Sequence, residues 1–318
     1  MWAYVAVALV ALVLLRRWYR ERQTVPGLPE KFVLITGCDS GFGSLLARQL
    51  DARGLRVLAA CLTEEGAEGL RAAASPRLQT LLLDVTSSPS IAAAAAWVKE
   101  RVGDRGLWGL VNNAGIAFPA APNEWLRKED FLKVINVNLI GLIEVTLSLL
   151  PLVRRARGRV VNVASVMGRL SFFGGGYCVS KFGVEAFSDS LRLDMRNFGV
   201  KVSVIEPGYF QTSITNEENA RKQFMVAWEK LPEEIKVAYG ENYLKHFLQT
   251  FRNMKDLCNP NLSLVTDCME HALTSRYPRT RYAAGWDAKL LYIPLSYAPS
   301  ALSDLVFAKH QPLPTQKA

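Results

Sequence analysis

The sequence predicts an α/β fold in which helices cover both faces of one doubly wound parallel sheet. Two observations predict this fold. Short runs rich in β-branched and aliphatic residues alternate with helical patterns from Lys31 to about Gly208. A glycine-rich loop, ITGCDSGFG at residues 35–43, joins the first of these runs to a helical pattern. With 318 residues, 50% of them hydrophobic, the chain is long enough for one large domain with a full core.

Six runs are predicted as the strands of this sheet, at residues 31–36, 55–61, 78–84, 108–113, 158–165 and 200–208. Helical patterns separate them, including an alanine-rich one at 90–102 and a long apolar one at 131–153. The alternation stops after Gly208. Residues 211–275 are predicted as a helical segment that covers the ligand-binding edge of the sheet. Its aromatic residues are interpreted as helix core rather than substrate contacts: Phe224, Trp228, Tyr239, Tyr243, Phe247 and Phe251.

Residues 1–22 are predicted to be a membrane anchor. As a helix, the apolar run Trp2 to Leu15 would span ~21 Å at ~1.5 Å per residue, which is shorter than a hydrocarbon core of ~30 Å. The run therefore either crosses the bilayer, with the arginine side chains reaching the headgroups, or lies at the membrane interface. A cleaved signal peptide is the alternative, but no basic segment precedes the run. The positive-inside rule places the globular part in the cytosol. The arginines that follow the run are Arg16, Arg17, Arg20 and Arg22.

The closing segment, residues 276–318, is apolar but interrupted by Pro294 and Pro299, and we expect it to lie on the surface or cap the domain. The net charge of +9 forms no stripe interleaved with stacking aromatics, which argues against nucleic acid and favours an anionic membrane surface. Five scattered cysteines without a CxxC pair and three unclustered histidines predict free thiols and no metal site.

The glycine-rich loop predicts dinucleotide binding. Gly37, Gly41 and Gly43 follow a predicted strand and precede a predicted helix, a context in which the backbone can approach a pyrophosphate at the N-terminus of the helix. Further along the chain lie LLLDV with Asp84, VNNAG at residues 111–115, VNVASV with Ser165, and YCVSK at residues 177–181.

With these motifs in this order, the sequence resembles the short-chain dehydrogenase/reductase family over roughly residues 31–212. The resemblance implies a Rossmann-type core at residues 30–210. It also implies a catalytic tetrad of Asn138, Ser165, Tyr177 and Lys181. The implied cofactor-binding residues are Gly37, Asp39, Ser40, Gly41, Phe42, Gly43, Asp84, Asn112, Ala114, Gly115, Lys181, Pro207, Gly208 and Thr212.

The residue types of the tetrad suit hydride transfer from an alcohol. Tyr177 and Lys181 are four residues apart and share one helical face, where the ammonium is expected to lower the pKa of the phenol so that it can take the alcohol proton. The resemblance implies that Ser165 holds the substrate oxygen and that Asn138 orders a water behind Lys181. Cys178 has no evident base and is interpreted as a packing residue.

Asp39 predicts NAD rather than NADP. Neither the glycine loop nor the end of the second strand offers an Arg or Lys for a 2′-phosphate, and Cys61 stands where many NAD enzymes carry an aspartate. The Asp39 carboxylate could accept a hydrogen bond from a free ribose hydroxyl and repel a 2′-phosphate. The alternative is that Asp39 only caps the following helix.

A narrower resemblance covers nearly the whole chain, through AACLTEEGAE, GLWGLVNNAGI, GGGYCVSKFGVEAFSDSLR and HALTSRYPRTRYAAGWDAKLL. These stretches are similar to the microsomal retinol and hydroxysteroid dehydrogenases. The resemblance implies an endoplasmic reticulum membrane enzyme that oxidises retinol or a 3α- or 17β-hydroxysteroid with NAD, and that pairs as a homodimer through its long helices. Two alternatives remain open: an NADP-linked carbonyl reductase, and a non-catalytic retinoid- or steroid-binding protein.

Overall fold

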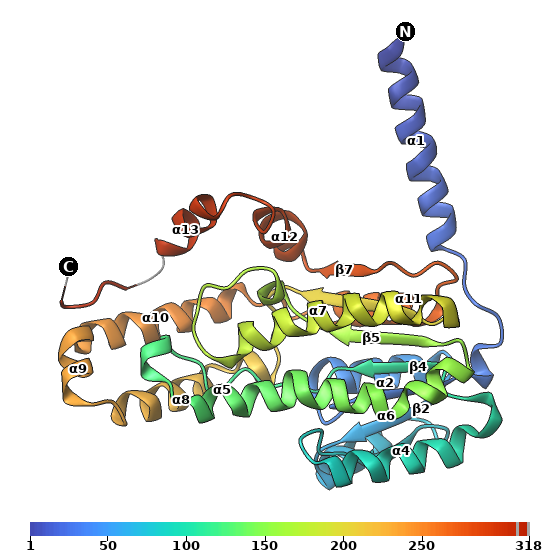
Figure 1. Cartoon of the computed structure of the whole chain (residues 1–318), viewed down its shortest axis with the longest axis horizontal. Coiled ribbons are helices and arrows are strands. Elements are labelled where there is room, and N and C mark those ends of the chain that lie inside the picture. The colour runs from blue at the N-terminus through green and yellow to red at the C-terminus, as the bar shows by residue number, and fades with distance from the viewer. Residues whose placement is uncertain (310–311, 317–318) are drawn as a thin grey trace.

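The computed structural model describes residues 1–309 and 312–316; residues 310–311 and 317–318 and the side chains of Ala3, Phe251, Met254 and Lys255 lie outside the described residues. One parallel sheet of seven strands forms the centre, in the order β3-β2-β1-β4-β5-β6-β7 (Figure 1). The predicted doubly wound α/β fold is confirmed. The strands are β1 (Phe32–Thr36), β2 (Arg56–Cys61), β3 (Gln79–Leu82), β4 (Gly109–Asn112), β5 (Arg159–Val163), β6 (Lys201–Pro207) and β7 (Arg281–Ala284).

The seventh strand, β7, was not predicted. It is four residues long, and it pairs in parallel with β6 from Val204↔Arg281 to Pro207↔Ala284. The expectation that strands end near Gly208 was therefore wrong. The run RYAA carries two alanines and one charge, so its composition does not resemble a strand. Pairing along β6, rather than local propensity, fixes its extended conformation.

Helices cover both faces of the sheet. The α-helices are α1 (Trp2–Glu21), α2 (Gly41–Ala52), α3 (Glu64–Ala72), α4 (Ser88–Val102), α5 (Lys128–Ile135), α6 (Leu142–Arg155), α7 (Gly176–Met195), α8 (Glu217–Glu229), α9 (Glu233–Tyr239), α10 (Glu241–Leu257), α11 (Ser263–Thr274), α12 (Ile293–Leu295) and α13 (Ser300–Ala308). Short helical turns also occur, among them the π-helical turns η4 (Asn136–Gly141) and η8 (Ala288–Tyr292) and the 3-10 turns η5 (Val166–Gly168) and η7 (Ser213–Thr215).

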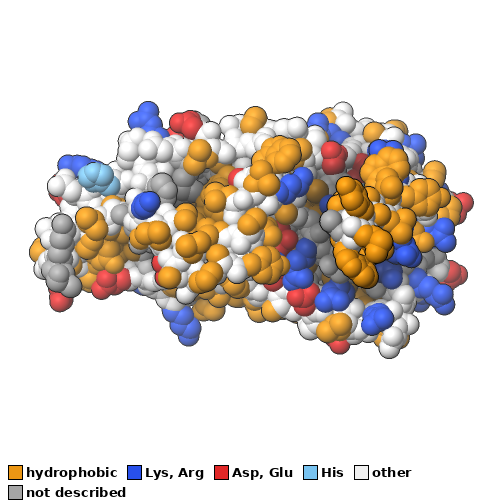
Figure 2. Space-filling view, turned by 90° about the horizontal axis from the view of Figure 1, so that it is seen from above, with side chains coloured by type: hydrophobic (Ala, Val, Ile, Leu, Met, Phe, Trp, Pro, Cys, Tyr) orange, Lys and Arg blue, Asp and Glu red, His pale blue; other side chains and the backbone are white. Residues whose placement is uncertain are grey.

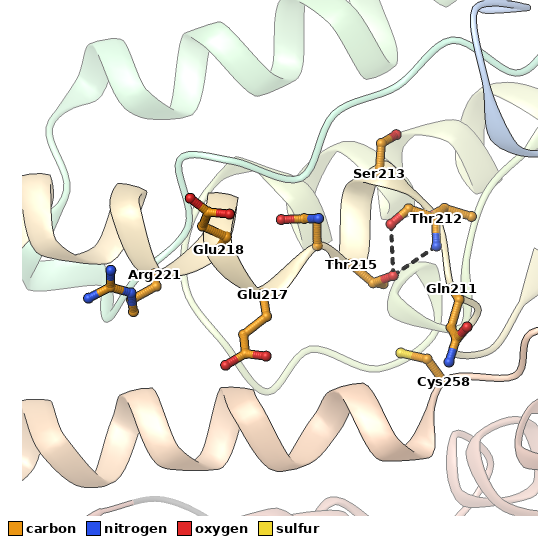
Figure 3. Close-up of a pocket in the computed structure, with 9 residues that line it drawn as sticks. Gln211, Thr212, Ser213, Thr215, Glu217, Glu218, Arg221 and Cys258 are labelled. Carbon is orange, nitrogen blue, oxygen red and sulfur yellow. Dashed lines mark hydrogen bonds between the residues drawn. The ribbon is translucent and has the colours of Figure 1, made fainter.

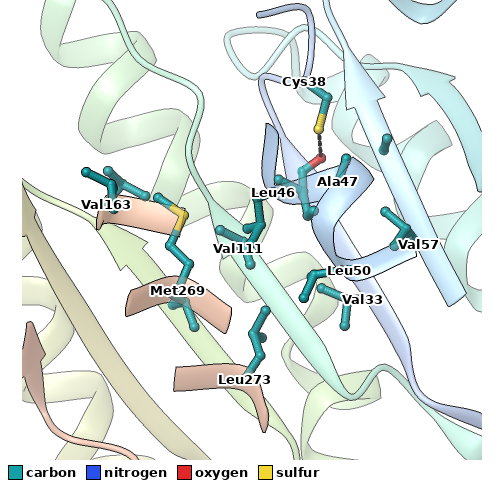
Figure 4. Close-up of a cluster of buried hydrophobic side chains, with 14 of the residues drawn as sticks. Val33, Cys38, Leu46, Ala47, Leu50, Val57, Val111, Val163, Met269 and Leu273 are labelled. Carbon is teal, nitrogen blue, oxygen red and sulfur yellow. Dashed lines mark hydrogen bonds between the residues drawn. The ribbon is translucent and has the colours of Figure 1, made fainter. Parts of the chain in front are cut away.

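Alternate residues of each strand enter two separate cores, because successive side chains of a strand point to opposite faces. On β1, Val33 and Ile35 pack with α2, α3 and α11, whereas Phe32 and Leu34 pack with α4, α6 and α7. Figure 4 shows the first of these cores, with Met269 of α11 among the strand valines. Burial on both faces fixes the register of the strands and hence the positions of the loops at their carboxyl ends.

One described stretch, Lys128–Arg155, has the length and apolar composition of a membrane span. It comprises α5, η4 and α6, and residues of α6 such as Val145, Leu149 and Val153 are buried against the sheet. This stretch is a core helix of the α/β fold.

Helices α8, α9 and α10 form a lobe at one end of the sheet (Figure 1). The buried indole of Trp125 lies at its centre, with ring centroids 5.1 Å from Trp228, 5.3 Å from Tyr239 and 6.0 Å from Phe247. Phe224 is buried in the same cluster, which also includes Tyr243. The five described aromatic side chains of this segment are therefore helix core, as predicted; the side chain of Phe251 lies outside the described residues.

The base of α1 is fastened to the far end of the chain. The Arg279 guanidinium donates two hydrogen bonds to the Glu21 carboxylate, one of them at 2.8 Å. A ring nitrogen of His271 lies 2.8 Å from the carbonyl oxygen of Glu21. Beyond this joint, α1 rises away from the sheet (Figure 1), and its described side chains before Glu21 are exposed.

Candidate active site at the carboxyl edge of the sheet

The glycine loop between β1 and α2 is packed too closely for side chains. A Cβ atom on Gly43 would lie 2.2 Å from the carbonyl oxygen of Gly37, and one on Gly37 would lie 2.8 Å from Cα of Ala114. Gly37 and Gly41 have positive φ values of 70° and 59°, which glycine adopts without strain. A Cβ on Gly41 would meet only Thr212, at an ordinary contact distance of 3.7 Å, so its positive φ rather than crowding favours glycine there. The loop therefore presents bare backbone, with Ser40 and Phe42 between the glycines.

Asp39 links this loop to the end of β2. Its carboxylate accepts hydrogen bonds from the backbone N–H groups of Leu62 at 2.9 Å and Thr63 at 3.0 Å, and from the Thr63 hydroxyl at 2.8 Å. The N-cap residue of α2 is Ser40. The interpretation of Asp39 as a cap of that helix was therefore wrong, because its carboxylate turns toward β2 instead. Cys61, at the end of β2, is buried.

The VNNAG segment fastens the loop from the other side. The Asn113 amide donates to the carbonyl oxygens of Thr36 at 2.9 Å and Gly37 at 3.0 Å. The buried Asn112 amide donates to Thr146 and to Asn162, both at 2.8 Å, so it ties β4 to β5 and α6. Asn113 was missing from the predicted site residues, although it lies between two of them.

Asp84 follows β3, and its carboxylate accepts hydrogen bonds from the N–H and the hydroxyl of Thr86 at 2.8 and 2.7 Å. Gly208 follows β6, where its missing side chain leaves room for Asp287, whose carboxylate accepts from the Tyr209 N–H at 2.7 Å. The predicted cofactor residues thus lie along the carboxyl edge of the sheet, where ligands of open α/β folds bind.

The predicted catalytic residues come together at the same edge. Tyr177 and Lys181 lie on α7, Ser165 lies two residues after β5 at the start of η5, and Asn138 lies in η4. Ser165 and Tyr177 line the same small cavity. The Lys181 ammonium donates to the Val163 carbonyl at 2.8 Å and lies 5.7 Å from the centre of the Tyr177 ring.

The side-chain amide of Asn138 bonds to the backbone of Ile116 through both its oxygen and its NH₂ group. Its oxygen accepts from the Ile116 N–H and its NH₂ donates to the Ile116 carbonyl, both at 2.8 Å. The NH₂ also donates to Ser180, one residue before Lys181, at 3.0 Å. The π-helical turn η4 directs this side chain out of the long helix toward α7, which fits the frequent occurrence of such turns at functional sites.

The acidities of the two titrating residues differ from the expectation. Burial raises the pKa of Tyr177 to about 12, and the hydrogen bond from Ser165 opposes this rise. Burial also lowers the pKa of Lys181 to about 8, opposed by the nearby charge of Glu185. The expected lowering of the Tyr177 pKa by Lys181 is therefore absent here: burial raises the pKa, and the Lys181 ammonium donates its hydrogen bond to Val163 instead of the phenol.

A buried charge network, which the sequence analysis missed, lies one helical turn beyond Lys181. Arg281 of β7 donates to Glu185 at 3.0 Å and to Asp189 at 2.6 Å. Arg169 donates to Glu206 of β6 at 3.0 Å, and Arg281 lies 3.9 Å from the same Glu206 oxygen. Burial and the neighbouring Glu206 raise the pKa of Glu185 to about 7. In the sequence, the only indication of this network was the position of Glu185, which is four residues after Lys181 and therefore on the same face of the helix.

Two neighbouring cavities lie beside the tetrad. One of about 90 Å³ is lined by Ser165 and Tyr177 and otherwise mostly by apolar side chains, including Phe118, Phe173 and Ile214. The other, of about 680 Å³, is open and lies between Thr212 and α8 (Figure 3). Both are lined by Thr215 and Cys258. The Thr215 hydroxyl donates to the Phe210 carbonyl at 2.7 Å, which fixes the partition between them.

A Rossmann-type sheet with a bare glycine loop and an adjacent Ser–Tyr–Lys group defines a nicotinamide-dependent oxidoreductase. The short-chain dehydrogenase family model matches residues 31–223, and the chain belongs to this family. Human retinol dehydrogenase 16 is 62% identical over 316 residues, and human 17-beta-hydroxysteroid dehydrogenase type 6 is 60% identical over 316 residues; both alignments cover 99% of each chain. A short-chain dehydrogenase structure from Streptomyces avermitilis is 26% identical with a TM-score of 0.66, covering 88% of this chain and 97% of that one.

Proposed function

We propose that the protein is an NAD-dependent alcohol dehydrogenase that oxidises retinol or a 3α- or 17β-hydroxysteroid to the carbonyl compound. The observation that carries the proposal is the small cavity in which the hydroxyls of Ser165 and Tyr177 meet mostly apolar side chains. An alcohol group can bind the two hydroxyls while its hydrocarbon part contacts the apolar wall. The names of the relatives at 60% identity or more support the same substrate class.

In this proposal Tyr177 takes the alcohol proton while Ser165 holds the alcohol oxygen. When bound, oxidised NAD would supply the hydride acceptor. Lys181 contributes a positive charge, and the Asn138–Ile116–Ser180 contacts hold its helix in position. This charge favours the phenolate that burial of the tyrosine otherwise disfavours. The residues proposed to hold the dinucleotide are the glycine loop, Asp84, the VNNAG segment and Thr212.

The preference for NAD rests on Asp39. Its carboxylate lies at the end of β2, beside Leu62 and Thr63, where the adenosine ribose of a dinucleotide binds in this fold. A 2′-phosphate there would meet a negative charge. Arg71, on α3, pairs with Glu64 at 2.7 Å, so its own charge is compensated.

The test is the initial rate of reduced-cofactor formation by membranes containing the full chain, with all-trans-retinol or a 3α-hydroxysteroid, comparing NAD with NADP. We expect a large preference for NAD, which Asp39→Asn should reduce. Equal or better use of NADP would indicate the carbonyl reductase instead. Binding of the alcohol without any turnover would indicate a non-catalytic retinoid- or steroid-binding protein.

We also place the protein in the endoplasmic reticulum membrane, with α1 as the anchor and the globular part in the cytosol. Helix α1 has 20 residues with exposed apolar side chains, and its apolar run Trp2 to Leu15 spans ~21 Å at ~1.5 Å per residue, so the arginines that follow must snorkel if it crosses the bilayer. Its last turns carry the arginines that the positive-inside rule assigns to the cytosol. Asn261-Leu262-Ser263 is a glycosylation sequon that is modified only on the lumenal side, so glycosylation at Asn261 in cells would contradict this orientation.

A homodimer through the long helices is part of the same proposal. Apolar side chains on η4, α6 and α7 are exposed although their helices are otherwise packed: Ile140, Leu147, Val179 and Phe182. On α7, Val179 and Phe182 are three residues apart and so share one face. Phe182→Asp should convert a dimer to a monomer in analytical ultracentrifugation of the detergent-solubilised chain, whereas Val237→Asp, on the surface of α9, should not.

A further inference from the structure

The segment that follows β7 exposes an unusual number of large apolar side chains. We define the C-terminal surface as Trp286, Leu290, Leu291, Tyr297, Leu302 and Leu305, which are 46 to 75% exposed. They come from the β7–η8 connection, η8, the α12–α13 connection and α13. Soluble surfaces seldom expose so many large apolar side chains along one short segment, and such patches mark interaction sites.

The C-terminal surface lies on the side of the molecule from which α1 rises. Strand β7 is one edge of the sheet, and η8, α12 and α13 continue from it, on the side where α1 leaves the body (Figure 1). Figure 2 looks onto this side and shows hydrophobic side chains spread across it, with Lys and Arg among them. The Glu21–Arg279 contact joins the base of α1 to the residues just before β7.

Charge on this side favours an anionic lipid surface. Exposed basic residues border the C-terminal surface at Arg276, Lys289 and Lys309, in addition to the arginines at the base of α1. On α13, Leu302 and Leu305 share one face, and Lys309 follows four residues later on that face. Asp304 lies on the other side of the same helix, nearer to Phe307 than to Leu302 by helical position.

The opposite face of α13 reaches the candidate active site through stacked rings. Phe307 stacks on Phe172 with centroids 4.1 Å apart, Phe172 contacts Phe173 at 5.5 Å, and Phe173 stacks on Tyr177 at 6.4 Å. Phe173 and Tyr177 line the small cavity. The rings of Phe307, Phe172 and Phe173 therefore form one aromatic layer between the C-terminal surface and the wall of the small cavity.

From this arrangement we infer that the C-terminal surface is a second membrane contact, lying in the interfacial layer of the bilayer that holds α1. The inference rests on the proposed anchoring by α1 for its orientation. Tryptophan, tyrosine and leucine above a basic border are the composition of segments that lie in a bilayer interface. The contact places the aromatic wall of the cavity beside the lipid in which an apolar alcohol dissolves.

The test measures probe depth in the full chain, reconstituted in vesicles of phosphatidylcholine and phosphatidylserine. An environment-sensitive fluorophore is attached to Leu290→Cys or Leu305→Cys, and quenching by lipids with a nitroxide on the acyl chain is recorded. Val10→Cys reports on α1. Leu82→Cys, half-exposed on β3 at the opposite edge of the sheet, is the matched control. The unchanged chain, whose five cysteines are buried or partly buried, gives the background.

We expect strong quenching at positions 10, 290 and 305 and none at 82. If the probe at position 10 is quenched but the probes at positions 290 and 305 are as unquenched as the control at position 82, the second membrane contact is overturned and the anchor remains. Quenching at 290 and 305 without quenching at 10 would support the contact and contradict the anchor. Absence of quenching at all three would overturn both.

Discussion

The ammonium group of Lys181 donates its hydrogen bond to the carbonyl oxygen of Val163, 2.8 Å away, and not to the phenol of Tyr177. Lysine and tyrosine thus lie one turn apart on α7, and β5 holds the lysine. This geometry makes Lys181 a source of positive potential for Tyr177 rather than its direct partner, while Ser165 opposes the rise that burial causes in the pKa of Tyr177.

Replacing the phenol should abolish the chemistry and spare binding. Tyr177→Phe keeps the ring stacked on Phe173 but removes the group that takes the alcohol proton. We expect kcat to fall by ~10²–10⁴-fold, the usual contribution of general acid–base catalysis, with little change in the Kd for NADH. Absorbance assays and NADH fluorescence titrations measure the two quantities. Tyr239→Phe, in the helical lobe, is the control; unchanged turnover in Tyr177→Phe would refute the assignment.

The rate of alcohol oxidation should depend on pH through Tyr177 and Lys181 together. Because the pKa of Tyr177 is raised to about 12, few molecules hold the phenolate at neutral pH, and kcat/KM should increase with pH. Because burial lowers the pKa of Lys181 to about 8, its positive charge favours the phenolate only below that pH, so Lys181→Met should reduce kcat/KM below about pH 8 and change it little above. A pH profile that superimposes on that of the unchanged enzyme would mean that Lys181 does not act on Tyr177.

Two glycines give a matched pair for the cofactor loop. A Cβ on Gly43 would lie 2.2 Å from a carbonyl oxygen, whereas one on Gly69 in α3 meets nothing within 4 Å. Gly43→Ala should therefore distort the loop and weaken NADH binding at least tenfold, while Gly69→Ala should leave it unchanged and stabilise α3 by up to ~1 kcal/mol. Calorimetric titration with NADH and thermal unfolding would reveal both effects. Normal affinity in Gly43→Ala would place the dinucleotide elsewhere.

The Glu185 network predicts a loss of stability as pH rises. An ordinary glutamate has a pKa of 4.5, whereas that of Glu185 is raised to about 7 by burial and Glu206. Between these values the folded protein binds more protons than the unfolded chain, so the free energy of unfolding should decrease as pH increases from about 4.5 to 7. Glu185→Gln should flatten this dependence in thermal unfolding, and the exposed Glu229→Gln should not. Parallel curves for both variants would show that Glu185 ionises normally.

Much of the site could be predicted from the sequence because its parts are local. A glycine loop between a strand and a helix, and a tyrosine four residues before a lysine, each carry their geometry within a few residues. The six predicted strands were found for the same reason, since each is a short run rich in aliphatic residues, buried in every case except the edge strand β3. Strand β7 was missed because only β6 makes RYAA extended.

The direction of the Asp39 side chain and the acidity of Tyr177 could not be read from the sequence. Asp39 binds Thr63, 24 residues away, and desolvation of Tyr177 depends on the packing of several elements around it. The Glu185–Arg281 contact joins residues 96 positions apart, so neither partner signals the other. These properties arise from tertiary packing rather than from local pattern.

The joint between Glu21 and the His271–Arg279 region has a consequence for synthesis of the chain. The hydrogen bonds to Glu21 come from residues 250 and 258 positions later. A ribosome therefore releases α1 long before its partners are translated, and an α1 already inserted in a membrane holds one end of a growing chain fixed. With α1 as the proposed anchor, the joint that orients the globular part relative to the lipid can form only after the His271–Arg279 region has been translated.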